Sequence, residues 1–219
     1  MVKLYGVARS RATRNLWLLG EIGMDYAHVP VMQGYRLADP LAEDAPLNTL
    51  SAEFLKLSPA GAVPVLEDDG FVLAESVAIN LYLAKKYGRA LGPEDGQEEA
   101  LMTQWGLYGA TVVEGPAVAI LYVHGDDRAK TPDGQVEIAV AREKLRRPLQ
   151  VLNDHLAAHG HMVGGRFTVA DINMAEMVRY ALAEKKLMKE FPAVNAWMKA
   201  LHGRAAFKAM WAMRLAEAE

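Results

Sequence analysis

The sequence predicts a small α/β domain over residues 1–84, a linker over 85–96 and an all-helical domain over 97–219. Short or alternating apolar runs, which favour strands, are confined to the first of these regions. The linker contains Gly92-Pro93 and several acidic residues, a composition typical of a domain boundary. The longer segments that follow all favour helix, and no convincing strand pair is found among them.

The first domain opens with a β–α–β pattern. Residues 2–5 alternate apolar and polar side chains, and residues 26–31 form a second short apolar run. Between them, apolar side chains at helical spacing predict a helix over 12–22, and Gly23 stands where a capping glycine belongs. Because strands joined by a crossover are normally parallel, we expect these two strands to pair in parallel.

An α–β–β–α pattern completes this domain. A short helix is predicted over 52–57 and a longer one over 76–87. Residues 63–66 and 71–73 flank an acidic turn that ends in glycine, which indicates a hairpin. Pro64 stands at the start of a strand and cannot donate to a ladder, so we expect an edge position or a cis peptide bond there.

Composition excludes several classes of function. The chain of 219 residues has a net charge of −3, which argues against a nucleic-acid binder held by a basic face. Cysteine is absent, which excludes disulfides, thiolate metal sites and a cysteine nucleophile; any thiol must come from a substrate or a cofactor. No uncharged apolar run reaches the ~18–20 residues that span a membrane. The N-terminus has no apolar core of signal-peptide length, so we expect a cytoplasmic protein.

Four segments, taken together and in order, resemble motifs of the cytosolic glutathione transferases of the serine type, in a bacterial-like form. They are Ser10-Arg11-Ala12-Thr13-Arg14, Ser58-Pro59-Ala60-Gly61-Ala62-Val63-Pro64-Val65-Leu66, Glu75-Ser76-Val77-Ala78-Ile79 and Phe167-Thr168-Val169-Ala170-Asp171. The resemblance covers essentially the whole chain. It implies a thioredoxin-like first domain followed by a helical bundle, with glutathione as co-substrate and no metal.

Ser10 is the candidate catalytic residue. From the residues alone it is either a helix-capping serine or part of an anion site, since free N–H groups and the helix dipole favour an anion there. In the family, a serine at this turn donates a hydrogen bond to the sulfur of glutathione. Lowering a thiol pKa from ~8.5 by two units takes ~2.7 kcal/mol, which a charge-assisted hydrogen bond and a helix dipole together supply. Arg14, four residues later, is expected to be structural.

The resemblance places the remaining glutathione contacts on two other segments. Val63 and Pro64 resemble the cis-proline turn whose backbone pairs with the cysteinyl unit, although such a turn also shapes the fold without a ligand. Glu75 and Ser76 open a helix and would hold the γ-glutamyl end, the alternative being an ordinary acidic helix start. Ala62 departs from the Lys or Gln that several classes place there, so the glycyl contact is missing or is made by loop 36–51.

The candidate lining of the pocket for a hydrophobic electrophile comprises Arg11, Trp105, Tyr108 and Val112. Arg11 is alternatively a solvated arginine that takes no part in binding. The three helical residues, together with Pro116, either face the first domain as a pocket or pack as interdomain core. For Tyr108 we favour the pocket.

Two further patterns are assigned to structure. Thr168 and Asp171 form a T-x-x-D capping box at the start of a helix. His155, His159 and His161 could indicate a metal site, but a helix C-terminus closed by glycine explains them, and no carboxylate cluster completes a site.

The sequence therefore predicts a detoxification enzyme that activates the glutathione thiolate for attack on a small hydrophobic electrophile. A homodimer is implied, with an interface from the helix after Glu75 and the helix from Gln97. No nucleic-acid or membrane partner is expected. Two alternatives remain open: a glutathione-dependent isomerase or dehalogenase, and a non-catalytic binding or regulatory relative with the same fold.

Overall fold

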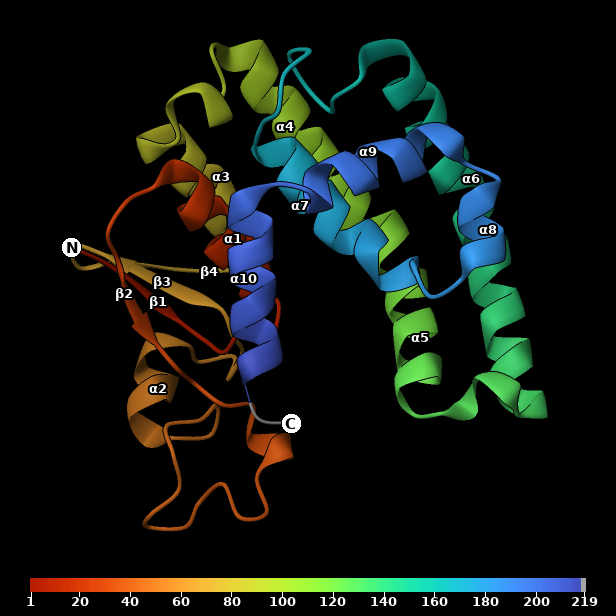
Figure 1. Cartoon of the computed structure of the whole chain (residues 1–219). Helices are drawn as coiled ribbons and strands as arrows, with labels where there is room; N and C mark the ends of the chain where they lie inside the picture. Colours follow the sequence, from red (N-terminus) through yellow and green to blue (C-terminus); the bar gives the residue numbers. More distant parts are fainter. Residues whose placement is uncertain (218–219) are drawn as a thin grey trace. The chain divides into compact units, whose positions relative to one another are not determined.

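The computed structural model describes residues 1–217, and the chain divides into two compact units (Figure 1). The first unit contains Met1–Arg89 together with the last helix, α10 (Ala205–Ala216). The second unit is Ala90–Arg204. The position of α10 differs from our expectation, which placed the whole of 97–219 in the helical domain.

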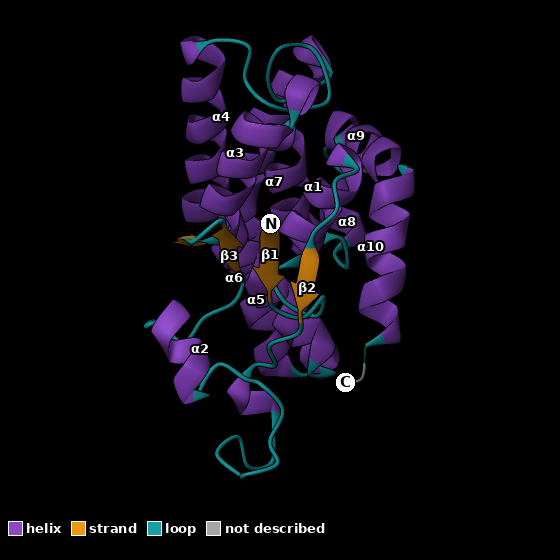
Figure 2. Ribbon diagram, turned by 90° about the vertical axis from the view of Figure 1, so that its left-hand side faces the viewer, coloured by secondary structure: helices purple, strands orange, loops and turns teal. Residues whose placement is uncertain are grey.

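The first unit is built on a four-stranded sheet with the strand order β2-β1-β3-β4. Figure 2 shows the neighbouring strands β2, β1 and β3. The central strand β1 (Val2–Tyr5) pairs in parallel with β2 (Ala27–Val29) and antiparallel with β3 (Val65–Asp68). The hairpin partner of β3 is β4 (Phe71–Ala74). This mixed order is the thioredoxin-like arrangement, so the predicted fold of this domain is confirmed.

Three helices accompany the sheet in sequence order: α1 (Thr13–Ile22), α2 (Ala52–Leu57) and α3 (Ser76–Tyr87). The first of them connects β1 to β2 and packs against α3. As predicted, α1 ends at Gly23, which adopts the left-handed conformation (φ 69°) that glycine accepts without steric cost.

The last helix belongs to the first unit because its apolar face covers α1 (Figure 1). The ring of Trp17, which is completely buried, meets the ring of Phe207 edge-on with centroids 4.9 Å apart. Gly20 permits a close approach of the two helices, since a Cβ there would lie 3.2 Å from the Cβ of Ala206. An amphipathic pattern shows that α10 must bury one face, but not against which partner.

The second unit is entirely helical as far as residues 90–204 are concerned, in agreement with the prediction. Its helices are α4 (Gly96–Tyr108), α5 (Glu114–Gly125), α6 (Pro132–His159), α7 (Val169–Val178), α8 (Lys185–Lys189) and α9 (Pro192–His202). All residues of α7 are buried, and both α4 and α5 pack against it. A helix that is buried on every side forms the centre of such a bundle.

A π-helical turn, Gly109–Val113, joins α4 to α5 in one stretch of 30 residues. By length and composition this stretch could cross a membrane, but core helices commonly share these properties. The side chains of Val113, Ala117 and Ile120 in this stretch are inaccessible to solvent, and α5 packs against α6 and α7. The close approach to α7 occurs at Gly109, where a Cβ would lie 2.4 Å from the sulfur of Met177.

The predicted capping box at the start of α7 is confirmed. Thr168 stands at the N-cap, and the backbone N–H of Thr168 donates to a carboxylate oxygen of Asp171 at 2.9 Å. The buried carboxylate has further donors that sequence spacing did not predict, among them the indole Nε1–H of Trp197 at 2.9 Å and the backbone N–H of Met162 at 3.1 Å. Asp171 therefore links α7 to α9 and to the loop before α7.

Candidate glutathione site

Three predicted segments come together around the start of α1, all within the first unit. Gly6 directly follows β1, and a Cβ built on it would lie 3.3 Å from the Cβ of Ala12 and 3.4 Å from that of Val63. The turn that carries Ser10 is thereby packed beside the Val63-Pro64 segment. On the other side, Asn15 of α1 donates from its amide to the backbone oxygen of Ser76 at 2.9 Å.

We expect Gly6→Ala to destabilise the first unit by about 1–3 kcal/mol, because φ at this position is 140° and a methyl group would push against two site segments. Urea unfolding measures the loss. Gly70→Ala is the matched control: its φ is also positive, at 87°, but nothing lies within 4 Å of the added Cβ. Equal losses in the two variants would show that the close approach at Gly6 contributes nothing.

Ser10 lies in the turn before α1 and does not cap it. The helix begins at Thr13, and Ala12 occupies the N-cap with helical dihedral angles, so the capping interpretation is wrong. The Ser10 hydroxyl accepts from the backbone N–H of Ala12 at 3.0 Å and donates to the backbone oxygen of Val7 at 2.6 Å. Since a hydroxyl carries one proton, Ser10 must rotate away from Val7 before it can donate to a ligand.

The Val63-Pro64 peptide bond is cis, which confirms the second of the two interpretations of Pro64. The segment leads directly into β3, which lies inside the sheet and not at its edge. The residues before the cis bond are fixed by the buried Ser58, whose hydroxyl donates to the backbone oxygen of Ala62 at 2.9 Å. Ala62 itself is exposed.

Glu75 and Ser76 open α3, as predicted. Glu75 is exposed and has φ 71° and ψ 110°, a region that residues other than glycine rarely occupy and that tends to occur at functional sites. The buried Ser76 hydroxyl accepts from Nη1 of Arg14 at 3.0 Å. A hydroxyl that accepts from a guanidinium still has its own proton to donate, so Ser76 is suited to an anionic ligand at a helix N-terminus. Arg14 is buried, as a structural role requires.

The candidate pocket residues are divided between the two units. Arg11 is exposed in the first unit. In the second unit, the nearly buried ring of Trp105 contacts Tyr108 (centroids 5.6 Å apart) and His155 (4.8 Å), so Trp105 takes part in the packing of that unit. Tyr108 is half-buried, and burial raises its pKa, while the charge of Arg147 opposes this rise. Val112 is exposed. Their shared role in a pocket remains a prediction.

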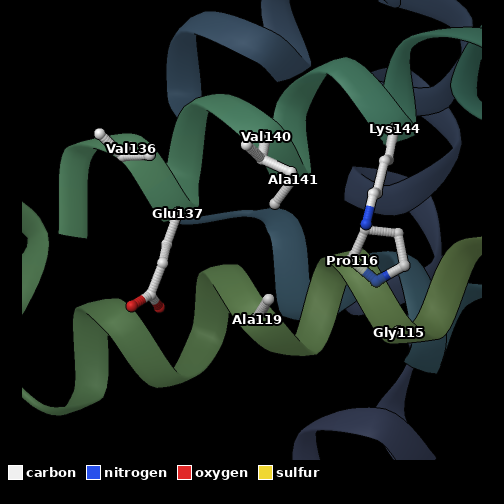
Figure 3. A pocket seen from close by; sticks show the side chains of 8 residues that line it. All are labelled: Gly115, Pro116, Ala119, Val136, Glu137, Val140, Ala141 and Lys144. Carbon is white, nitrogen blue, oxygen red and sulfur yellow. The ribbon is translucent and has the colours of Figure 1, made fainter. Parts of the chain in front are cut away.

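Pro116, grouped with these residues by the sequence, lines a groove within the second unit. This groove lies between α5 and α6 and has a volume of about 450 Å³ (Figure 3). Lys144 extends from α6 toward Pro116, and Glu137 marks the other end of the groove (Figure 3). Most of its remaining lining is apolar: Gly115, Ala119, Val136, Val140 and Ala141.

The three histidines around Gly160 have separate partners. The ring of His155 is 3.0 Å from the backbone oxygen of Met162, and the ring of His161 is 3.3 Å from the carboxylate of Asp171. The ring of His159 packs at a tilted angle against that of His155, with centroids 4.7 Å apart. Within residues 1–217, no three His, Asp or Glu side chains gather as they would around a metal ion.

Sequence reasoning missed the part that the C-terminal helix takes in this site. Glu217 follows α10, and its carboxylate accepts from the backbone N–H groups of Ala8 and Arg9, directly before Ser10. These residues lie 209 and 208 positions apart in the chain. A lone glutamate after an amphipathic helix has no sequence signal that distinguishes it from a solvated residue.

Comparison with known proteins identifies the family. The sequence model of the family glutathione S-transferase, N-terminal domain, matches residues 1–85. The sequence model of the family glutathione S-transferase, C-terminal domain, matches residues 113–205. Together with the thioredoxin-like sheet and the helical second unit, these matches show that the chain belongs to the glutathione S-transferase family.

Individual relatives give more detail. Glutathione S-transferase D6 of Drosophila melanogaster is 28% identical over 205 residues, which is 90% of this chain and 85% of the relative. The theta class glutathione S-transferase of Xanthomonas axonopodis pv. citri, solved with glutathione bound, is 25% identical with a TM-score of 0.74 over 95% of each chain. Elongation factor 1-gamma of Equus caballus is 30% identical over 167 residues, which is 72% of this chain but 36% of that protein. Relatives therefore carry names other than transferase, and family membership alone does not assign the reaction.

Proposed function

We propose that this protein is a glutathione transferase that activates the glutathione thiol at the Ser10 turn for attack on a hydrophobic electrophile. The observation that carries the proposal is the convergence of the Ser10 turn, the cis Val63-Pro64 segment and Ser76 around the start of α1. A relative solved with glutathione bound, of similar fold and length, supports the choice of ligand.

Each segment would bind a different part of glutathione. The N-terminus of α3 and the Ser76 hydroxyl would take the γ-glutamyl carboxylate, with Glu75 near the ammonium group. The backbone at Val63 would pair with the cysteinyl unit in the manner of an added strand. Ala62 offers only its backbone to the glycyl end, so we expect that contact to be weak or to come from loop 36–51.

In the proposed chemical step the protein supplies one side-chain group, the hydroxyl of Ser10. Once the thiol has lost its proton to solvent water, the Ser10 hydroxyl turns from the Val7 oxygen to the sulfur and donates a hydrogen bond to the thiolate. Such a charge-assisted bond contributes ~1.5–3 kcal/mol, about what is needed to bring a thiol pKa close to neutrality. The thiolate then attacks the electrophilic carbon and the leaving group departs.

Retention on glutathione-agarose combined with a conjugation assay with an aryl halide tests this function. Retention with turnover supports the transferase. Retention without turnover favours the second candidate, a non-catalytic binding protein, to which the similarity with elongation factor 1-gamma lends weight. Isomerisation or dehalogenation substrates in the same assay separate the remaining alternatives. We retain the homodimer and the cytoplasmic location as parts of the proposal.

We expect Ser76→Ala and Glu75→Ala to raise the glutathione KM roughly tenfold, with a smaller effect on kcat. The γ-glutamyl end is the same in the ground state and the transition state, so losing its contact weakens the binding of both states equally and raises KM. A charge-assisted hydrogen bond of ~1.5 kcal/mol corresponds to about a tenfold change in KM. Initial rates at varied glutathione concentration measure both constants. Glu53→Ala, at an exposed position of α2 to which no glutathione contact is assigned, serves as control. An unchanged KM in both variants would remove this end of the site from the proposal.

A further inference from the structure

The C-terminal segment of the first unit places a carboxylate on the turn that carries Ser10. One oxygen of Glu217 accepts from the backbone N–H of Ala8 at 2.6 Å, and the other accepts from that of Arg9 at 2.7 Å. Two consecutive backbone N–H groups that point at the two oxygens of one carboxylate form an anion hole. Such donors cost no reorganisation when an anion arrives, because the turn already holds them in place.

Two positively charged side chains of the described residues lie beside this hole. Arg9 donates from Nε to the backbone oxygen of Glu217 at 3.0 Å, and Arg214 donates from Nη1 to the backbone oxygen of Ala8 at 2.7 Å. Positive charge next to the two backbone N–H groups favours an anion at this place.

The place of the hole in the chain indicates which ligand would use it. Ala8 and Arg9 directly precede Ser10, the residue proposed to meet the sulfur of glutathione. An electrophile must approach that sulfur to within bonding distance, so a group on the electrophile can reach this turn. The carboxylates of glutathione have other places in the proposed site, the γ-glutamyl one at Ser76 and the glycyl one beyond Ala62.

We propose that the backbone N–H groups of Ala8 and Arg9 form a subsite for a carboxylate on the electrophilic co-substrate, and that Glu217 occupies this subsite as an internal ligand until the co-substrate displaces it. The inference rests on the proposed function and names its substrate class: electrophiles that carry a carboxylate. Glu217 follows the last residue of α10, so it can leave the hole while the helix remains intact.

Glu217, as the internal ligand, weakens the binding of a carboxylate from solution by an amount that depends on how often the subsite is open. The apparent dissociation constant equals the intrinsic constant divided by the fraction of molecules with an open subsite. If Glu217 leaves the subsite in one molecule out of ten or fewer, its removal strengthens carboxylate binding about tenfold or more. A neutral amide of the same shape gains less, because the hydrogen bonds that its carbonyl oxygen accepts from the two N–H groups are not charge-assisted.

Inhibition of the aryl-halide conjugation by benzoate and by benzamide tests the subsite. In Glu217→Ala we expect the inhibition constant of benzoate to fall about tenfold or more, and in Glu217→Gln by a smaller factor. Benzamide should gain much less than benzoate in both variants. Glu53→Gln, an exposed residue of α2, makes the same change of charge elsewhere in the first unit and should behave as the unmodified protein.

Two results would overturn the inference: equal benzoate inhibition in all variants, or an equal gain for benzoate and benzamide, which would mean only that the pocket had widened. Titration calorimetry of benzoate without glutathione repeats the comparison in the absence of turnover. A protein that fails to conjugate but shows the benzoate gain refutes the proposed function and supports the subsite. Should Glu217→Ala not fold, Glu217→Gln, which keeps the size of the side chain, carries the same comparison.

Discussion

Ser10→Ala is expected to lower the conjugation rate roughly ten- to a hundredfold, the equivalent of a charge-assisted hydrogen bond of ~1.5–3 kcal/mol. Glutathione affinity should stay within several-fold, because the hydroxyl acts on the sulfur while most binding contacts lie on the peptide. Steady-state kinetics at saturating electrophile, with glutathione varied, separates the two quantities.

The pH dependence of the rate gives a second measure of the same effect. Without the hydrogen bond the thiolate form of bound glutathione is less favoured, so the pKa of its thiol rises. The rate of Ser10→Ala should therefore be lowest relative to the unmodified protein below that pKa, and should recover as the pH increases. A pH–rate profile that coincides with that of the unmodified protein would speak against a role for this hydroxyl.

Two control variants separate chemistry from the shape of the turn. Ser10→Thr keeps the hydroxyl and should retain most of the activity, since the bonds to Val7 and Ala12 can re-form. Thr13→Ala removes the neighbouring hydroxyl, which donates to the Ser10 backbone oxygen at 3.2 Å. If Thr13→Ala abolishes activity and Ser10→Ala does not, the catalytic hydroxyl has been assigned to the wrong residue.

Asp171→Ala should lower the free energy of unfolding by about 3–5 kcal/mol, since three buried donors lose their acceptor and each unsatisfied group costs ~1–3 kcal/mol. The donors are the backbone N–H groups of Thr168 and Met162 and the indole N–H of Trp197. Denaturant unfolding measures the loss, and activity per folded molecule at low temperature should survive. Loss of kcat with an unchanged melting curve would contradict this structural role.

The His161–Asp171 pair adds a pH dependence to this stability. The hydrogen bond that His161 donates to the carboxylate of Asp171 raises the pKa of His161 above its usual 6.5, although burial opposes the rise. A raised pKa in the folded state means that the pair stabilises the protein fully below pH 6.5 and that this contribution is lost as the pH rises through the folded pKa. His161→Gln should remove the dependence, and melting temperatures between pH 5 and 8 measure it.

Interactions between near neighbours in the chain were determined by the sequence itself. The end of α1 at Gly23 and the capping box of Thr168 and Asp171 depend on backbone groups within about four residues, which spacing reveals directly. The order of β1 and β2 follows from the handedness of the crossover between them. Such rules are local, and they sufficed for the elements and for both kinds of domain, whereas the segments of the proposed site were assigned from the family resemblance.

Only the tertiary structure decided which distant groups meet. The hydroxyl of Ser76 pairs with Arg14, Trp105 packs against His155, and Glu217 reaches Ala8 and Arg9 across more than 200 residues. Helix α10 joins the first unit because Phe207 covers Trp17. An apolar face or a charge in the sequence shows that a partner is needed, but burial and hydrogen bonding can be satisfied by many partners. The packed chain selects one of them.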